Sequence, residues 1–302
     1  MSKDFSGGYS FLKIIVLYLL AMRKIKFLSI LVLASTVVFI HSCKKNTKAV
    51  DTETQSVVDN SICEQEFMQI QPTINNLAIK TKGTGAQRLT GASGGCDSLT
   101  YISGDTTYTN LLSPPTYSFN YGTCSLVNID GVTRTGSVWI RFLGRPRNVN
   151  SKTIIKLINY KVNGALTYSC DSIVVTNLNP ITNPIKSFSV QIINGVCTGT
   201  GWNIKFHSVK TIDVNTNNTP LIQNDDVLTV KGTAGGTNRN NVDFDVAINS
   251  ITKPANCKWI TSGTLDITPK DLSKRTVDYG NGTCDDNATF TVNGQTIAFK
   301  LK

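Results

Sequence analysis

The chain has 302 residues, a formal net charge of +10, 40% hydrophobic and 17% charged residues. This length is enough to bury a substantial core, as one large domain or two small ones. It contains only two histidines, and its three glutamates all lie before residue 67. This scarcity argues against histidine-rich metal sites and against a glycosidase site built from two glutamates.

The first recognisable element is an uncharged apolar run, FLSILVLASTVVFI at residues 27–40, which follows the bases Arg23, Lys24 and Lys26. A basic segment followed by a short apolar one is typical of a secretory signal peptide. Fourteen residues rise only about 21 Å as a helix, whereas a bilayer core is roughly 30 Å thick. We therefore prefer a signal peptide to a permanent membrane span.

Residues 1–21 hold a second apolar run, IIVLYLLA at 14–21, and Met22 begins a complete signal by itself. The simplest interpretation is that translation starts at Met22. The alternative is a membrane hairpin of two spans. Both runs are short for spans, and the gap between them holds three bases and no turn signal.

The signal ends in Ile40-His41-Ser42-Cys43, which resembles a bacterial lipobox although His41 replaces the small residue usual at its position. The resemblance implies a signal region over 1–42, a Cys43 that carries palmitate and other lipid, and a tether over 43–55. The alternative is an ordinary signal peptide with an incidental Cys43. Removing 1–42 takes away five bases and one acid, which leaves a charge of +6. Such a mild surplus indicates a solvated basic surface, and an exported chain meets no cytoplasmic nucleic acid.

The tether leads into a helix and linker over 56–82. Apolar residues recur there at spacings of three to five, which predicts a helix that Pro72 kinks or splits. The residues concerned are Val58, Ile62, Phe67, Ile70, Ile74 and Leu77. Residues 80–95 are rich in Gly, Thr and Ser, and we interpret them as a loop.

Residues 83–302 are predicted to form an antiparallel β domain. Phe188, Val190 and Ile192 alternate with polar residues, and the same period of two recurs around Val138 and Phe244. Tight turns are predicted at Asp130-Gly131, Asn163-Gly164, Asn194-Gly195 and Asn293-Gly294. The pattern predicts an all-β fold of about ten to thirteen strands, arranged as a sandwich or a curved half-barrel, with a short N-terminal helix.

Six cysteines divide this domain into three similar units. The spacings are 28 residues for Cys96–Cys124 and 27 residues for both Cys170–Cys197 and Cys257–Cys284. In a hairpin, the first residue of one strand faces the last residue of its partner, close enough for a disulfide. We therefore predict these three disulfides. Metal binding is the alternative, but no CxxC occurs. Cys63 is left over.

Several segments together resemble uncharacterised lipoproteins of the Bacteroidota. They are the lipobox, CDSLTYISGDTTYT at 96–109, TRTGSVWI at 133–140 and DYGNGTCDDNATFTVNG at 278–294. The resemblance implies an outer-membrane lipoprotein, facing the periplasm or the cell surface, and gives no activity. It also implies candidate O-glycosylation at Ser98, Thr106 and Ser172.

Two patterns in the sequence resemble chemical sites. Residues 91–95 fit G-x-S-x-G, but a nucleophile elbow needs a strand before the serine and a helix after it, so we prefer a linker. Asp213, Asn215 and Asn217 begin like a calcium loop whose later ligand positions do not match, which leaves an irregular site with Asp225 and Asp226 as the alternative to an Asn-rich hairpin. We predict no catalytic residue, no metal and no cofactor.

The remaining candidate is a contact for an anion or a glycan. Trp139 and Arg141 are two residues apart on a predicted strand and therefore share a face, where stacking and forked hydrogen bonds would hold such a group. An exposed face with an aromatic neighbour is the alternative interpretation.

The function predicted from the sequence is a non-enzymatic binding or scaffolding module, anchored to the membrane by lipid. Its partner would be an envelope protein, a glycan or a lipid. The alternatives are a carrier or sensor that holds an apolar ligand in a half-barrel, and a glycan-binding adhesin or glycan-active enzyme.

Overall fold

The computed structural model describes residues 51–80, 98–122, 130–180, 183, 185–219 and 224–301, with the backbone alone over 71–80. The chain divides into two compact units, Met1–Asp51 and Thr52–Lys302, and the fold described below is that of the second. The predicted signal region, Cys43 and the G-x-S-x-G segment all lie outside the described residues.

The second unit pairs one helix, α2 (Gln55–Lys80), with one antiparallel sheet of fourteen strands. The strands are β1 (Ser98–Ser103), β2 (Thr116–Asn120), β3 (Arg134–Phe142), β4 (Lys152–Val162), β5 (Leu166–Ser169), β6 (Ser172–Asn177), β7 (Ile185–Gly199), β8 (Trp202–Asn215), β9 (Val227–Thr237), β10 (Asp243–Pro254), β11 (Ser262–Pro269), β12 (Arg275–Asn281), β13 (Asn287–Val292) and β14 (Gln295–Lys300). Neighbours in sequence are neighbours in the sheet, except that β6 lies beside β4 and β7, off the main path. The predicted all-β class is confirmed.

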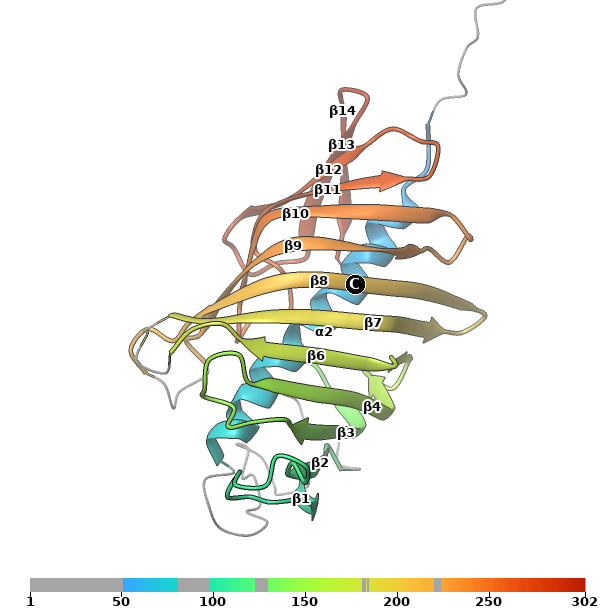
Figure 1. Cartoon of the computed structure of the whole chain (residues 1–302). Coiled ribbons are helices and arrows are strands. Elements are labelled where there is room, and N and C mark those ends of the chain that lie inside the picture. Colours follow the sequence, from blue (N-terminus) through green and yellow to red (C-terminus); the bar gives the residue numbers. More distant parts are fainter. Residues whose placement is uncertain are drawn as a thin grey trace, which may run out of the picture. The chain divides into compact units, whose positions relative to one another are not determined.

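The sheet curves around α2, which runs diagonally across the strands in Figure 1. Successive side chains along each strand point to opposite faces of the sheet, and every second one faces the helix. On β8, Ile204, Phe206 and Ile212 are buried against α2, whereas Lys205 and His207 between them point to the outer face. The second unit therefore has two layers, and its core lies between the helix and the concave face of the sheet.

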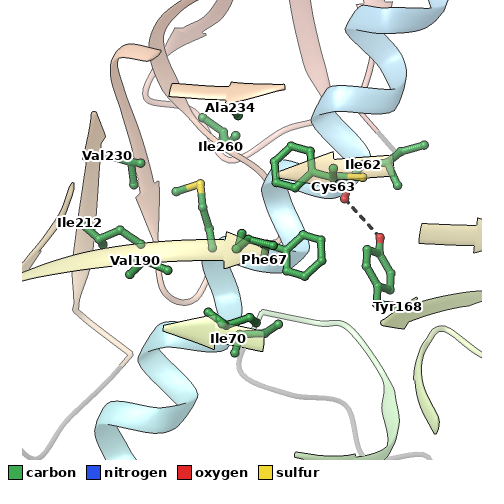
Figure 2. Close-up of a cluster of buried hydrophobic side chains, with 14 of the residues drawn as sticks. Ile62, Cys63, Phe67, Ile70, Tyr168, Val190, Ile212, Val230, Ala234 and Ile260 are labelled. Carbon is green, nitrogen blue, oxygen red and sulfur yellow. Dashed lines mark hydrogen bonds between the residues drawn. The ribbon is translucent and has the colours of Figure 1, made fainter. Parts of the chain in front are cut away.

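The predicted helix is present as one continuous element through Pro72, which does not split it. Its central apolar contact is Phe67, which stacks on Phe206 with ring centroids 5.5 Å apart and meets Tyr168 edge-on at 5.8 Å (Figure 2). Aromatic pairs in these arrangements add to the stabilisation from burial alone. Phe67 thus fixes the middle of the helix against β5 and β8.

Two of the predicted tight turns connect neighbouring strands. Asn163-Gly164 joins β4 to β5 and Asn293-Gly294 joins β13 to β14, with positive φ at both residues of each pair. The prediction for Asn194-Gly195 is wrong, because this pair lies inside β7, where the register with β8 shifts. A Cβ added to Gly195 would lie 3.1 Å from the Phe67 ring, so this glycine makes room for the helix.

The structure contains the disulfide Cys257–Cys284, with Cα atoms 5.9 Å apart. The predicted pairing is confirmed, but its cysteines lie outside β11 and β12, beyond the Ser262–Asn281 pair, and not at facing strand positions. The prediction for Cys170–Cys197 is corrected, because the two cysteines are not bonded to each other. Cys197 pairs with Tyr168 across β5 and β7, so Cys170 is two residues out of register. Cys96 and Cys124 lie outside the described residues.

Candidate functional site

The concave face of the sheet is occupied by α2, which is held there by buried ion pairs. Three acids of the helix each meet a base from the sheet side: Glu66 with Arg134 at 2.9 Å, Glu64 with Lys210 at 2.6 Å, and Asp59 with Arg239 at 2.6 Å. Buried charges require such partners, because an unpaired charge away from water is very costly.

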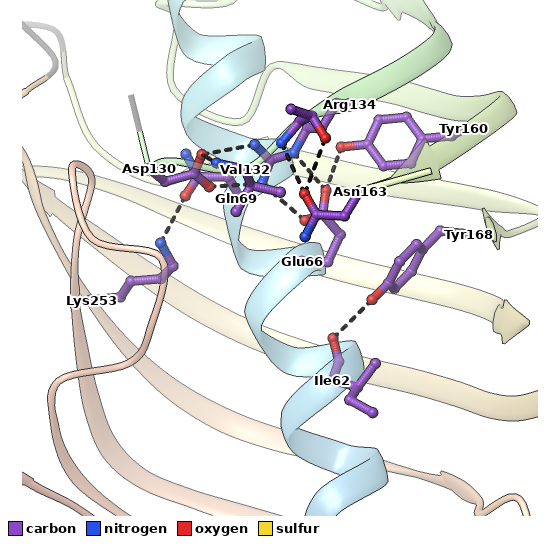
Figure 3. A network of polar contacts seen from close by, with 11 residues as sticks. Ile62, Glu66, Gln69, Asp130, Val132, Arg134, Tyr160, Asn163, Tyr168 and Lys253 are labelled. Atoms are coloured by element: carbon purple, nitrogen blue, oxygen red, sulfur yellow. Dashed lines mark hydrogen bonds and ion pairs between the residues drawn. The ribbon is translucent and has the colours of Figure 1, made fainter. Parts of the chain in front are cut away.

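Arg134 is the centre of the densest part of this arrangement (Figure 3). Its guanidinium donates to both carboxylate oxygens of Glu66 at 2.9 Å and to both oxygens of Asp130 at 2.8–2.9 Å. The Tyr160 hydroxyl donates to the same Glu66 carboxylate. A planar guanidinium that grips two carboxylates fixes orientation as well as charge. This network determines where the helix lies across β3 and β4.

Lys253 on β10 is a further buried base on this side. Its ammonium donates to Gln69 Oε1 of the helix at 3.0 Å and to the carbonyl of Cys257. Burial lowers the pKa of Lys253 to about 8, because the charged form is disfavoured away from water. The inner side of the sheet therefore acts as a basic cradle for an acidic helix.

The outer face carries a different feature, an open cleft of about 810 Å³ at one end of β7–β11. Titratable side chains from three places in the chain line it: Lys205 and His207 on β8, Asp243 and Asp245 on β10, and Lys270 and Asp271 after β11. All six are exposed. A concave site with several converging polar groups is the usual form of a ligand site.

The strand register brings these side chains together in two rows. Lys205, Thr237 and Asp243 lie side by side on β8, β9 and β10, and the Thr237 hydroxyl donates to Asp243 Oδ1 at 2.8 Å. Two residues further along the strands, Gly235 on β9 lies between His207 on β8 and Asp245 on β10. The two rows present both signs of charge on one surface.

Gly235 lies beneath the space between His207 and Asp245 in the cleft. A Cβ built on this residue would lie 3.0 Å from Cε1 and Nε2 of His207, so the imidazole leans over the glycine toward β10. The same Cβ would lie 2.9 Å from the carbonyl oxygen of Phe244. A side chain here would displace the imidazole, and the glycine thus keeps the space between His207 and Asp245 open.

The charged groups of the cleft are free to meet a ligand. Within the described residues, the side chains of Lys205, His207, Asp245 and Lys270 make no hydrogen bond or ion pair. No group of three or more His, Cys, Asp or Glu side chains suited to a metal ion occurs in that same part of the chain. The cleft is therefore a candidate site for a polar ligand that carries hydroxyl or charged groups.

The predicted contact at Trp139 and Arg141 lies elsewhere on the sheet. Both side chains are on the outer face of β3 and half-buried, and the ammonium of Lys156 is 5.9 Å from the centre of the Trp139 ring. Arg141 Nε is buried and has no hydrogen-bond partner among the described residues. The pair shares a face as expected, but neither residue lines the cleft.

The other candidates are placed as follows. Ser98 and Thr106 are exposed and Ser172 is half-buried, and the attachment of glycans to them stays a prediction. In the proposed calcium segment, Asp213 accepts a hydrogen bond from Ser187 at 2.5 Å, and Asp225 accepts one from Thr219 at 2.6 Å. Each hydroxyl thus binds one carboxylate oxygen, whereas Asp225 Oδ1 and Asp226 Oδ1 are buried without a hydrogen-bond partner among the described residues.

Neither the buried bases of the inner face nor the outer cleft is among the sites predicted above, although each has a signal in the sequence. Arg134 and Lys210 occupy positions in phase with buried apolar residues of their strands. A base in the apolar phase of an alternating strand indicates a buried partner charge. For the cleft, the signal is the pair Gly235-Gly236 inside a strand, which indicates a close approach of other groups.

Comparison of the chain with protein-family models, with curated proteins and with solved structures finds no match. Among the described residues, no helix is both long and apolar enough to cross a bilayer.

Proposed function

We propose that this protein is a lipid-anchored protein of the cell envelope whose β domain is a binding or scaffolding module. The observation that carries the proposal is the contrast between the two faces of the sheet. Charges on the concave side are taken up by α2, whereas the charges around the outer cleft face solvent. The outer cleft is therefore the binding surface that we assign to the module.

A polar ligand suits this surface better than an apolar one. Two lysines, an imidazole and the carboxylates of Asp243 and Asp245 offer donors and acceptors for hydroxyl, carboxylate and amine groups. We favour a glycan of the envelope as the ligand, because sugars present such groups at high density. An apolar ligand carried inside the half-barrel would have to displace α2 together with its buried ion pairs.

Native mass spectrometry of the Cys43→Ser chain, recovered from an exporting host without harsh detergent, tests the binding function. We expect an adduct with the mass of a glycan fragment. The triple variant Lys205→Ser, His207→Ser, Lys270→Ser should lose it. A control with exposed lysines away from the cleft, Lys161→Ser and Lys231→Ser, should retain it.

Two outcomes would contradict the proposal. A lipid-sized adduct that survives the triple variant would favour the carrier. A mass without any adduct in every preparation would remove small-ligand binding and direct attention to protein partners. The anchor is tested separately, by labelling cells with palmitate: the unsubstituted chain should be labelled and the Cys43→Ser variant should not.

A further inference from the structure

Two free cysteines from distant parts of the chain meet inside the core. Cys63 on α2 and Cys197 on β7 both have an exposed fraction of 0%. The two thiols are close enough for each to shift the pKa of the other, upward for Cys63 and downward for Cys197. In sequence they are separated by more than half of the described domain.

The surrounding contacts fix this meeting point independently. Tyr168 is the direct cross-strand partner of Cys197, and its hydroxyl donates to the carbonyl of Ile62, the residue before Cys63, at 3.2 Å (Figure 2). The Phe67 ring, one helical turn further along α2, packs against both Tyr168 and Gly195. The helix and β7 are thus held together on both sides of the two thiols.

We propose that Cys63 and Cys197 form a disulfide when the chain folds in an oxidising compartment, and that Cys170 stays a thiol. The oxidant would be a small or protein-borne disulfide. A thiolate of the pair attacks one sulfur of that disulfide, which releases one thiol of the oxidant and leaves a mixed disulfide. The second cysteine then attacks the protein sulfur of the mixed disulfide and releases the other thiol. One S–S bond breaks, one forms, and the two protons and two electrons leave with the oxidant as two thiols.

Cys170 is the poorer partner for Cys197. Extending the register of β5 and β7 places Cys170 opposite Gly195, two residues away. Tyr168 stands directly across from Cys197 and takes the place that a paired cysteine would need. The proposal does not rest on the lipid anchor or on the cleft.

The order of events follows from burial. Disulfide exchange needs a thiolate in contact with the oxidant, and neither thiol is accessible once α2 is in place. Burial also raises the pKa of the Cys63 thiol, with the nearby carboxylates of Asp59 and Glu64 acting in the same direction. The bond therefore forms while the helix is still docking, and a folded chain that was prepared reduced should oxidise slowly.

Connectivity has to be measured directly, because a mass cannot distinguish the alternatives. Pairing Cys197 with Cys63 or with Cys170 removes the same number of hydrogens. Cleavage after Lys and Arg solves this, since Cys63, Cys170 and Cys197 fall on three different tryptic peptides, 49–80, 162–186 and 187–205. The Cys43→Ser chain is denatured, reduced, refolded with oxidised glutathione, alkylated under denaturing conditions and digested without reduction.

We expect the peptides 49–80 and 187–205 to be joined, and 162–186 to be alkylated at Cys170. Only preparations that contain the Cys257–Cys284 link are scored, which shows that oxidation took place. Recovery of Cys63 and Cys197 as alkylated residues, or of 162–186 joined to 187–205, would overturn the proposal.

Variants supply a second test with its own control. Cys170→Ser should leave the joined peptides unchanged, whereas Cys63→Ser should leave Cys197 alkylated and Cys170 still unpaired. If Cys63→Ser does not fold, the mapping of the chain with all three cysteines decides by itself. After native alkylation of the refolded chain followed by denaturation, reduction and a second label, Cys170 should carry the first label, whereas Cys63 and Cys197 should carry the second.

Discussion

Lys205 and Lys210 lie five residues apart on β8, yet the two faces of the sheet give them opposite roles. Lys210 has an exposed fraction of 2% and binds Glu64 of the helix at 2.6 Å. Lys205 points outward into the cleft and, among the described residues, has no side-chain partner. In an alternating strand, the face toward which a charged side chain points decides whether it stabilises the fold or can meet a ligand. The type of residue does not decide this, since both are lysines.

The largest effect should come from breaking a buried ion pair. Lys210→Ala leaves the Glu64 carboxylate buried without its base, which we expect to lower the free energy of unfolding by about 3–5 kcal/mol. Lys205→Ala on the same strand should change it by less than ~0.5 kcal/mol. Urea unfolding of both variants at pH 7 measures the difference, and equal effects would refute the contrast between the faces.

Removing the disulfide should have the next largest effect. Cys257→Ser opens a loop with a sequence separation of 27 residues, and loop closure of this size stabilises by about 3–4 kcal/mol. Cys170→Ser, which breaks no bond, serves as the control and should cost less than ~1 kcal/mol. Thermal unfolding without reductant compares the two, and a loss of similar size in both would contradict the prediction.

A smaller, pH-dependent effect is expected from Lys253. Its folded-state pKa of about 8 lies below the ordinary value of 10.5, so the unfolded chain binds more protons between these values. Stability should therefore rise by about 2 kcal/mol between pH 8 and pH 10. Lys253→Met should remove this rise in urea unfolding followed across that range. A rise that persists in the variant would assign it to other groups.

The smallest effect on stability is expected in the cleft. His207→Ala and Asp245→Ala remove exposed side chains without partners among the described residues, and each should change the free energy of unfolding by less than ~0.5 kcal/mol. The same variants should weaken binding of the adduct seen by native mass spectrometry. A marked loss of stability would instead show that these residues support the fold.

Much of the architecture follows from local patterns in the sequence. The period of two around Val190 and Phe244 predicts the strands, and the apolar spacing between Ile62 and Ile70 predicts the helix. These patterns report which face of an element is apolar, and that information is enough for the fold class.

The pairing of distant side chains is what local patterns do not contain. That Glu66 meets Arg134, or that the thiol of Cys63 meets Cys197, depends on how a curved sheet closes on a helix from another part of the chain. A shift of two residues in register separates Cys170 from Cys197, and nothing in their spacing reveals it. The cleft likewise depends on five strands, β7–β11, being adjacent in the sheet.

The helix is synthesised before the sheet, but the bases that pair with its acids come later in the chain. This order sets the time at which the domain can fold. Its partners Arg134, Lys210, Arg239 and Arg275 follow their contacts on the helix side by 68, 146, 180 and 222 positions. A chain emerging from its N-terminus cannot satisfy these charges until nearly all of it is present. The domain should consequently remain unfolded during most of its synthesis and close only when the final strands are present.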